Sequence, residues 1–461
     1  GALNQQANQL ACLLRQEGLQ QGEAVGILLT RSVNMVVALL GVLKAGGTYI
    51  PLDPNYPRSR LDHIIEDTAL RQVISQSNTH ELLALTGITQ WLLDDNQLQQ
   101  QLSQYPTTNL ARNVNANSAQ NCYLIYTSGS TGKPKGVSIA HRNAMAMVQW
   151  GGEFYQQDEL AGVLASTSLN FDLSVFELFV PLSFGGKVIV VENILSLLSE
   201  DIAGIRLVNT VPSGIDALVS AQRLPSSVVS VNLAGEPLKK VLVETLFAEH
   251  SLRRVVNLYG PSEDTTYSTY YEMTSAPSKE PRIGKPIANT QVYVLGAQEE
   301  LLPLGVTGEL YLGGAGVANG YFNQAELTAS RFVKNPFSHE ADSRLYKTGD
   351  LVRYDEEGQL CFIGRTDEQV KIRGFRVEVA EIEHHLNEHN SVLEAIVLVT
   401  QGSNEQQLQA YVRTDEEETG LAQQLRSHLL SALPEYMVPS RFVFMAQWPL
   451  SANGKIDKQA L

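Results

Sequence analysis

The chain has 461 residues, of which 43% are hydrophobic and 18% are charged. This mixture excludes a disordered, collagen-like or coiled-coil chain, and at about 150 residues per domain the length suggests about three domain-sized units. The sequence has 34 Lys and Arg against 49 Asp and Glu, a net charge of −15, which argues against binding to the nucleic-acid backbone.

Strand-like and helical patterns alternate through the first three quarters of the chain. Residues 24–29 are typical of a buried strand, and residues 33–44 are typical of a helix that ends at Gly46. Further strands are predicted at 123–126, 187–191, 228–233 and 255–258, and further helices at 175–182 and 238–250. Such alternation predicts an α/β architecture with largely parallel sheets.

The pattern changes after Arg282. Short strands and glycine turns indicate a β-rich unit, with strands at 291–295, 308–314 and 360–364. A small α+β pattern follows, with helices at 379–389 and 420–432 and strands at 393–399 and 408–412. We place the main boundary at 365–367, which gives an N-terminal domain of residues 1–366 and a C-terminal domain of residues 367–461. The polar stretch 97–120 is expected to be a surface excursion.

The spacing of the cysteines and the pattern at the N-terminus indicate the cellular compartment in which we expect the protein. Cys12, Cys122 and Cys361 lie far apart, so the sequence predicts neither a disulfide framework nor a zinc motif. No secretory signal pattern opens the chain, and no apolar stretch approaches the ~18 residues of a membrane span. We therefore expect a cytoplasmic protein in a reducing environment.

A glycine-rich segment, residues 126–137, follows a predicted strand. Glycines let backbone N–H groups approach phosphate oxygens, hydroxyls add donors and lysines add positive charge. The residues of these types are Thr127, Ser128, Gly129, Ser130, Thr131, Gly132, Lys133, Lys135 and Gly136. Pro134 follows Lys133, so this is not a Walker A loop, and Asn319 breaks the only approach to a dinucleotide fingerprint. The segment predicts phosphate binding.

The segment resembles the signature of the adenylate-forming superfamily, specifically the amino-acid adenylation domains of nonribosomal peptide synthetases. Motifs in the family's order extend over nearly the whole chain, at 43–54, 126–137, 171–174, 257–263, 308–314, 346–350, 364–367, 374–376, 433–440 and 453–457. The family's most N-terminal motif is absent, so we expect the chain to begin inside the usual domain. The resemblance implies a multi-lobed N-terminal domain, with two α/β sheets and a barrel-like β-rich subdomain, and a small mobile C-terminal lid.

The resemblance also implies roles for individual residues. Lys455 and Lys135 are expected to be catalytic, Glu263 to hold Mg²⁺ and Asp367 to be the hinge of the lid. The expected ATP-binding residues are Thr127, Ser128, Gly129, Ser130, Thr131, Gly132, Tyr259, Gly260, Asp350, Phe362 and Arg365. Asp172 is expected to pair with the α-ammonium of an amino acid, although a helix N-cap is the alternative.

The remaining pocket positions follow by local motif alignment. They are Leu173, Phe176, Asn209, Asn232, Ala234, Leu258, Thr266 and Tyr267. None of them is charged, which favours a small neutral substrate, with alanine first, then glycine, then cysteine or serine.

The implied reaction is formation of aminoacyl-AMP from ATP, with loss of pyrophosphate, followed by transfer to the phosphopantetheine thiol of a carrier protein. We expect a monomeric excised domain with no nucleic-acid or membrane partner, and whether a small activating protein is needed stays open. Two alternatives remain: an acyl- or aryl-acid CoA ligase, and a catalytically silent scaffold domain. An inverzincin-like pattern at 385–389 is better explained as a solvated helix face.

Overall fold

The structure is a computed structural model that describes residues 1–83, 87–111, 117–129, 132–340, 342–401, 406–415, 419–449, 456–458 and 460–461. Contacts between residues divide it into two units. The first comprises residues 1–54, 65–126 and 136–366, and the second comprises residues 55–64, 127–135 and 367–461. The long C-terminal segment of the second unit thus begins at Asp367, and the glycine-rich segment 127–135 groups with it.

The first sheet of the first unit is mostly parallel, in the order β16-β6-β5-β2-β1-β3-β4. Its strands are β1 (Ala24–Ile27), β2 (Thr48–Pro51), β3 (Gln72–Ser75), β4 (Thr89–Leu92), β5 (Asn121–Thr127), β6 (Lys135–Ala140) and β16 (Gly320–Tyr321). The accompanying helices are α1 (Ala2–Gln16), α2 (Val33–Ala45) and α4 (Asn96–Leu102), whereas α3 (Arg58–Thr68) begins in the second unit and ends in the first. Ser32 caps α2 by accepting from the Met35 N–H at 3.3 Å, and Gly46 ends it with φ 92°, as predicted.

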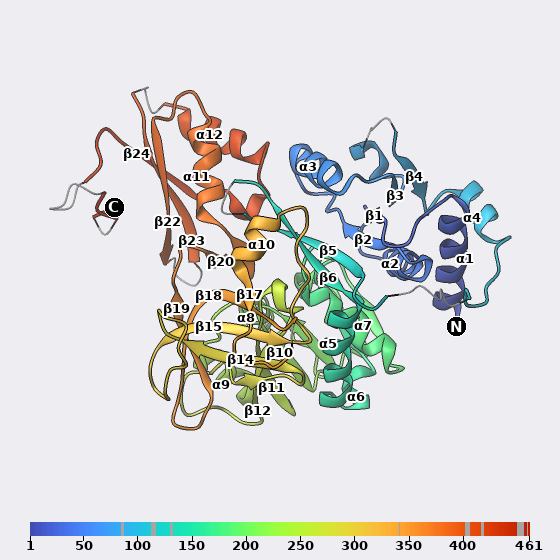
Figure 1. Ribbon diagram of the computed structural model, residues 1–461, viewed down its shortest axis with the longest axis horizontal. Helices are drawn as coiled ribbons and strands as arrows, with labels where there is room; N and C mark the ends of the chain where they lie inside the picture. Colours follow the sequence, from blue (N-terminus) through green and yellow to red (C-terminus); the bar gives the residue numbers. More distant parts are fainter. Residues whose placement is uncertain are drawn as a thin grey trace. The chain divides into compact units, whose positions relative to one another are not determined.

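The second sheet has the order β13-β12-β11-β10-β9-β7-β8, and Figure 1 labels β10, β11 and β12 of it. Its strands are β7 (Val163–Ala165), β8 (Val188–Val190), β9 (Leu207–Thr210), β10 (Ser230–Leu233), β11 (Arg254–Tyr259), β12 (Thr269–Met273) and β13 (Lys285–Pro286). The helices near it are α5 (His141–Phe154), α6 (Gln157–Leu160), α7 (Leu173–Ser183), α8 (Pro212–Ser220) and α9 (Lys240–Glu249), with short 3₁₀ turns at Ile194–Leu198 and Ser262–Asp264.

Successive residues of this sheet enter two different cores. Val256 packs with residues of α5 and α7, whereas Val255 packs with residues of α8 and α9. Because neighbouring side chains of a strand point to opposite faces, this alternation shows that helices cover both faces of the sheet. The carboxyl ends of the parallel strands β9, β10 and β11 are thereby held at one edge.

A third, antiparallel sheet has the order β14-β15-β18-β17, and β19 pairs with β18. Its strands are β14 (Thr290–Leu295), β15 (Gly308–Gly314), β17 (Phe332–Lys334), β18 (Arg344–Tyr354) and β19 (Leu360–Arg365), and α10 (Ala325–Arg331) precedes β17. Tyr259, the last residue of β11, shares a small core with Leu310, Val352 and Leu360 of this sheet. The β-rich subdomain is therefore packed onto the end of β11.

The second unit is built around a three-stranded sheet, β22 (Glu394–Gln401), β23 (Gln406–Arg413) and β24 (Arg441–Met445). It also contains the hairpin β20 (Val370–Ile372) and β21 (Phe375–Val377), the helices α11 (Val379–Asn387) and α12 (Leu421–Leu430), and a 3₁₀ turn at Glu435–Met437. Ile382, Val397, Ala410 and Leu425 pack in its separate core. The predicted α/β class with a small α+β C-terminal part is confirmed by these sheets.

The predicted surface excursion at 97–120 overlaps a short helix that the sequence did not indicate. This helix, α4, covers Asn96–Leu102, with Asp95 accepting from the N–H groups of Gln97 and Leu98 at 2.9 Å. The glutamine-rich sequence lacks a helical apolar stripe, and only Leu98 and Leu102 are buried. The helix therefore depends on its N-cap and on these two buried leucines, and two apolar positions are too few to indicate a helix in the sequence.

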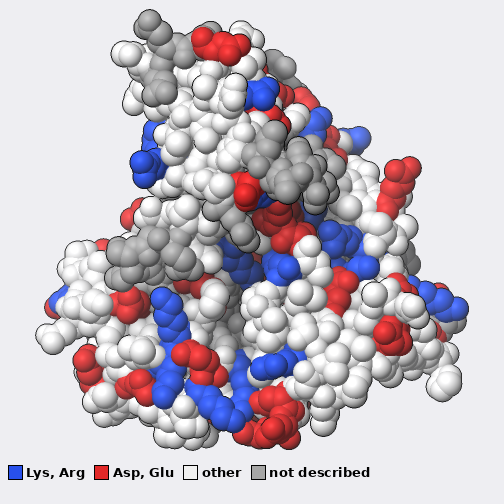
Figure 2. All heavy atoms as spheres, turned by 90° about the vertical axis from the view of Figure 1, so that its left-hand side faces the viewer, with Lys and Arg blue, Asp and Glu red and all other residues white. Residues whose placement is uncertain are grey.

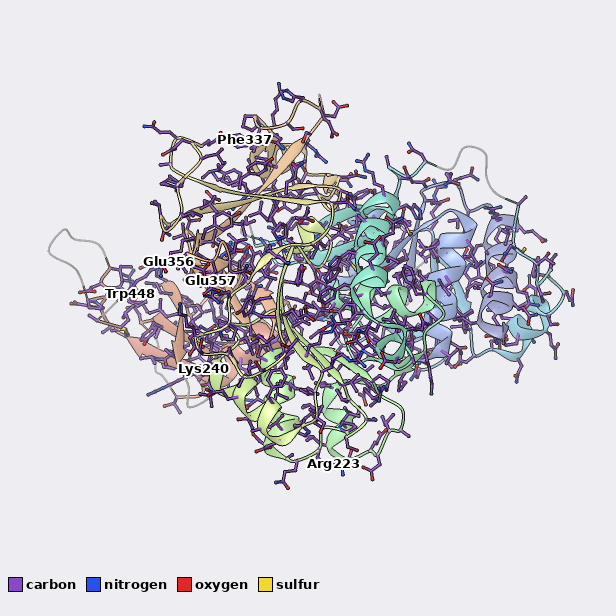
Figure 3. All side chains as sticks on the ribbon, turned by 90° about the horizontal axis from the view of Figure 1, so that it is seen from below. Arg223, Lys240, Phe337, Glu356, Glu357 and Trp448 are labelled. Carbon is purple, nitrogen blue, oxygen red and sulfur yellow. The ribbon has the colours of Figure 1, made fainter. Side chains whose placement is uncertain are left out.

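Basic and acidic side chains lie among one another on the face drawn in Figure 2. Arg223 and Lys240, which Figure 3 shows at the periphery of the first unit, pair with Asp201 at 3.0 Å and Glu244 at 3.4 Å. Among the helices that the structure describes, none is long and apolar enough to cross a membrane.

Candidate active site

Three residues predicted to bind ATP meet in the first unit, each from a different strand. Asp350 of β18 accepts hydrogen bonds from the Tyr259 hydroxyl and from Nη1 of Arg365. Asp350 and Arg365 are direct cross-strand partners. Burial and the nearby Asp350 carboxylate raise the pKa of Tyr259 well above its ordinary value, so its hydroxyl remains a donor.

Backbone geometry fixes this cluster. Gly349 has φ 76° and accepts from the Thr366 N–H at 2.8 Å, while Arg365 Nη2 donates to the Thr348 carbonyl at 3.2 Å. A Cβ at Gly260 would lie 2.5 Å from the Thr266 carbonyl oxygen, so only glycine fits after Tyr259. A carboxylate has about four acceptor sites, and Asp350 can therefore accept a ribose diol as well as its present donors.

Phe362, also predicted to contact nucleotide, lies on β19 opposite Val352 and is 41% exposed. Its ring is thus accessible for stacking on this side of the β-rich subdomain.

Glu263 lies in the short turn that follows β11. It is fully buried, and its Oε1 accepts from the Tyr321 hydroxyl at 2.7 Å. Among the described residues, no group of three or more His, Cys, Asp and Glu is arranged to hold a metal ion. A single carboxylate nevertheless fits Mg²⁺, which in nucleotide sites takes one or two carboxylates and completes its shell with phosphates and water.

The neighbouring Asp264 was not identified from the sequence. It is buried, accepts from the Ser268 hydroxyl at 2.6 Å, and its Oδ1 lies 2.8 Å from where a Cβ of Gly316 would stand. Burial raises the pKa of Asp264 to about 8. A lone aspartate beside a predicted metal ligand gave no indication of burial in the sequence.

The predicted amino-acid pocket gathers at the carboxyl ends of β9, β10 and β11. Asn209 and Asn232 are register partners on β9 and β10, and both are fully buried. Ala234 follows β10, and Leu258 is the penultimate residue of β11. Asn232 Oδ1 accepts from the Tyr155 hydroxyl at 2.9 Å, while its Nδ2 has no partner among the described residues.

The turn after Glu263 supplies the opposite wall. Tyr267 is fully buried, donates to Asn209 Oδ1 at 2.7 Å, and packs its ring 5.7 Å from that of Phe176. Thr266 has φ 73° and donates to the Asp172 carbonyl at 3.0 Å. The strained backbone at Thr266 is the kind of cost found where a binding site needs a side chain in one position.

Asp172 stands at the N-cap of α7, one residue before Leu173. Its side chain accepts no capping hydrogen bond, and it is 8% exposed. Its charge contributes to raising the pKa values of Tyr123 and Tyr267, although burial is the larger cause for both tyrosines. Asp172 is thus the N-cap residue by position but makes no capping hydrogen bond with its side chain, and its charge acts on Tyr123 and Tyr267.

Glu177, the residue after Phe176 on α7, is a buried carboxylate that the sequence did not single out. It accepts from the N–H groups of Ser166 and Thr167, both at 3.0 Å, from the Thr167 hydroxyl at 2.6 Å and from Asn209 Nδ2 at 3.1 Å. A signal was present, because Glu177 is the only charged residue in the apolar helix Leu173–Ser183.

We expect Glu177 to make stability depend on pH. Burial raises its pKa from 4.5 to about 7. The folded chain then binds this proton more tightly than the unfolded chain. The resulting contribution to the free energy of unfolding is complete below about pH 4.5 and is lost as pH rises to about 7. The melting temperature of Glu177→Gln, relative to wild type, should therefore rise by about 2 °C or more between pH 5 and pH 8.

Scanning calorimetry across this pH range tests that shift. Asp264 titrates in both proteins and cancels from the difference. Melting temperatures that run parallel from pH 5 to pH 8 would show that Glu177 has no raised pKa.

In the second unit, the glycine-rich segment is held by residues near α11. Ser128 Oγ donates to the Arg376 carbonyl at 2.8 Å, the Gly129 N–H donates to Glu381 Oε2 at 3.1 Å, and Lys135 Nζ lies 3.9 Å from Glu378 Oε1. A Cβ at Gly129 would clash with the Lys133 carbonyl oxygen. Gly129 and Lys133 therefore lie close together, and the Gly129 N–H binds a carboxylate in this structure.

Some predicted residues cannot be placed. Ser130, Thr131 and Lys455 lie outside the described residues. Thr127 ends β5, and Asp367 begins the C-terminal segment of the second unit and accepts from the Gln369 N–H at 3.3 Å.

Comparison with known proteins identifies related sequences and structures. The family model described as AMP-binding enzyme matches residues 1–322, and that of its C-terminal domain matches residues 381–455. A linear gramicidin synthase protein of Brevibacillus parabrevis is 46% identical over 462 residues, covering 100% of this chain but only 9% of the relative's own length.

Two solved structures are similar as well. The four-domain nonribosomal peptide synthetase AB3403, bound to AMP and glycine, has a TM-score of 0.68 and 34% identity, covering 99% of this chain and 34% of that one. PA1221, a synthetase protein with adenylation and carrier domains, has a TM-score of 0.84 and 26% identity, covering 99% of this chain and 78% of that one. These findings confirm the resemblance seen in the motifs: the chain belongs to the AMP-binding enzyme family and is similar to adenylation domains of nonribosomal peptide synthetases.

Proposed function

We propose that the chain activates an amino acid with ATP. A carboxylate oxygen of the amino acid attacks the α-phosphorus, the bond to the leaving oxygen breaks, and pyrophosphate departs, which leaves aminoacyl-AMP. Such a transfer requires alignment of the reactants and stabilisation of developing charge more than covalent chemistry by the protein.

The observation that carries the amino-acid assignment is the Asp172 carboxylate. It is buried, its side chain makes no capping hydrogen bond at the start of α7, and its charge acts on Tyr267, which donates to Asn209. A carboxylate in such a place attracts a cationic group strongly, because water screens the charge little there. The α-ammonium of an amino acid is such a group, whereas an acyl or aryl acid has none.

The nucleotide half of the proposal is supported by Tyr259, Asp350 and Arg365. Tyr259 offers an aromatic face for adenine, Asp350 accepts from the ribose hydroxyls, and Arg365 holds the Asp350 carboxylate in place. Glu263 would hold Mg²⁺, which when bound neutralises phosphate charge. In the second unit, the N–H groups of 127–132 and Lys135 would receive phosphate oxygens, and Lys455 would contact the reacting carboxylate.

A second step would transfer the aminoacyl group to a carrier protein. The phosphopantetheine thiolate attacks the acyl carbon, a thioester forms and AMP leaves. PA1221 contains adenylation and carrier domains in one chain, which supports a carrier protein as partner. We assign Asp367 as the hinge that moves the C-terminal unit between the two steps.

The substrate we propose is a small neutral amino acid, alanine first, then glycine, then cysteine or serine. Phe176, Leu258 and Tyr267 are each no more than 2% exposed and fill the pocket with rigid bulk. The pocket positions other than Asp172 carry no charge, so an ionic side chain would lose its hydration without gaining a partner.

Amino-acid-dependent exchange of labelled pyrophosphate into ATP tests the proposal over all twenty amino acids, with propionate as an acid that lacks the ammonium. We expect exchange with alanine to exceed exchange with propionate at least about a hundredfold, since a desolvated ion pair is at stake. No exchange with any acid contradicts adenylation, and strong exchange with phenylalanine, tyrosine or arginine contradicts the small pocket. Equal exchange with propionate and alanine favours the acyl-acid alternative.

A further inference from the structure

A continuous chain of hydrogen bonds runs from the end of β7 to the pocket wall. The backbone N–H groups of Ser166 and Thr167 donate to Glu177 Oε2 at 3.0 Å. Asn209 Nδ2 donates to Glu177 Oε1 at 3.1 Å, and the Tyr267 hydroxyl donates to Asn209 Oδ1 at 2.7 Å. All five residues belong to the first unit, and Glu177, Asn209 and Tyr267 are each fully buried.

The carboxylate gives this chain a direction. In its ionised form, which prevails above about pH 7, Glu177 accepts hydrogen bonds only, so Asn209 must turn its NH₂ group toward Glu177 and its oxygen toward Tyr267. Tyr267 must then donate its single proton to Asn209. Tyr267 can then offer the pocket only its aromatic ring and a lone pair of its hydroxyl oxygen, because its one proton is already donated to Asn209.

Glu177 also joins the elements that form the pocket. It lies on α7, the helix that begins after Asp172 and carries Leu173 and Phe176. Its partners lie after β7 and on β9, and the last link reaches the turn that holds Tyr267 against Phe176 at 5.7 Å. Its position, one residue from Phe176, lets it control the wall without touching the substrate.

An ordinary stabilising role for Glu177 is a weaker explanation. Burying an ionised carboxylate is costly, and an amide of the same size is the cheaper solution when only packing is required. Glutamine cannot replace it here, because its NH₂ would face either the N–H groups of Ser166 and Thr167 or the NH₂ of Asn209. The arrangement requires a group that accepts from every side.

We propose that Glu177 is a positioning residue for amino-acid selection: through Asn209 it fixes the direction of the Tyr267 hydrogen bond, and with it the polarity of the pocket wall that faces the substrate side chain. This inference rests on the proposed function, since Asn209 and Tyr267 are taken there as substrate-binding residues.

The test compares Glu177→Gln with the exchanged pair Glu177→Gln/Asn209→Asp. In the single variant, donor meets donor and Asn209 must turn over, which reverses the bond to Tyr267. In the exchanged pair, the new amide donates to the new carboxylate, its oxygen accepts from Ser166 and Thr167, and Tyr267 again donates to residue 209. Of the donors that Glu177 receives in the wild type, only the Thr167 hydroxyl, which donates to Glu177 Oε1, then loses its acceptor.

Pyrophosphate exchange on the full chain is measured with alanine, glycine and serine, together with the KM for ATP. We expect Glu177→Gln to raise the KM for alanine about tenfold and to change the alanine-to-serine ratio, with the KM for ATP within about twofold of wild type. The exchanged pair should restore the alanine KM and the ratio to within about threefold. In the Tyr267→Phe background, Glu177→Gln should change the alanine-to-serine ratio by less than about twofold, because the hydrogen bond from residue 267 to Asn209 is already absent.

Other outcomes overturn the inference. An unchanged KM for alanine and an unchanged alanine-to-serine ratio in Glu177→Gln would overturn it. Equal increases in the KM values for alanine, serine and ATP, without recovery in the exchanged pair, would indicate a structural role and would also overturn it. If Glu177→Gln does not fold, the other two variants decide. A wild-type alanine-to-serine ratio in Tyr267→Phe contradicts the inference, whereas a wild-type ratio in the exchanged pair supports it. An inactive wild type overturns the proposed function itself, whereas an active wild type with an indifferent Glu177→Gln overturns this inference alone.

Discussion

Replacing Asp172 with alanine is expected to lower kcat/KM for alanine about a thousandfold in pyrophosphate exchange. Removing one member of a buried charge pair costs about 3–5 kcal/mol, because the other charge is left desolvated, and each 1.36 kcal/mol is about tenfold in rate. Asp172 is 8% exposed, and its side chain makes no capping bond at the start of α7.

Propionate separates ion pairing from general damage. It has no ammonium, so its exchange should change little or rise when Asp172 is removed, and the alanine-to-propionate ratio should fall steeply. The KM for ATP should stay within about threefold of wild type, since the predicted ATP ligands Tyr259, Asp350 and Arg365 lie on β11, β18 and β19, whereas Asp172 lies at the start of α7.

A matched control is Asp201→Ala. Asp201 is exposed and pairs with Arg223 at 3.0 Å, so its removal should leave exchange and melting temperature nearly unchanged. Equal losses for alanine and propionate in Asp172→Ala, together with a lowered melting temperature, would return Asp172 to a structural role at the start of α7.

The nucleotide cluster could be predicted because its residues stand inside short motifs. Tyr259, Asp350 and Arg365 each follow or belong to a strand with a recognisable turn, and the sheet pairing then brings them together. The contact itself was not predictable from spacing, since 91 residues separate Tyr259 from Asp350. The motifs predicted these residues as ATP ligands, and the fold shows that they contact one another.

Two buried carboxylates, Glu177 and Asp264, were missed by sequence reasoning. Glu177 and Asp264 lie in segments whose role seemed settled by a neighbouring motif residue, Phe176 and Glu263. Whether a carboxylate is solvated or surrounded by donors depends on residues distant along the chain, such as Asn209 for Glu177. A single sequence shows the charge and not its partners.

The glycine-rich segment shows a second limit. Its composition predicts anion binding from local chemistry alone, but its grouping with residues 55–64 and 367–461 follows from long-range contacts. Ser128 and Gly129 contact Arg376 and Glu381, about 250 residues later in the chain. Domain limits drawn from changes in pattern along the sequence place this segment with its chain neighbours.

Lys455→Ala is expected to separate the two half-reactions. If Lys455 stabilises charge on the reacting carboxylate and the α-phosphate, its loss should lower pyrophosphate exchange at least about a thousandfold. Transfer from alanyl-AMP, supplied ready-made, to the thiol of a phosphopantetheinylated carrier protein should stay within about threefold of wild type, because that step no longer needs the lysine.

Lys458→Ala provides the matched control in the same segment. Lys458 pairs with Glu368 near the start of the C-terminal segment and is 43% exposed, so its loss should leave both steps nearly unchanged. If Asp367 is the hinge that we propose, adenylation and thiol transfer use different positions of the C-terminal unit, and only one of them places Lys455 at the reacting atoms. Equal loss of both half-reactions in Lys455→Ala would contradict this alternation, because a lysine that leaves the site after the first step has no charge to stabilise in the second.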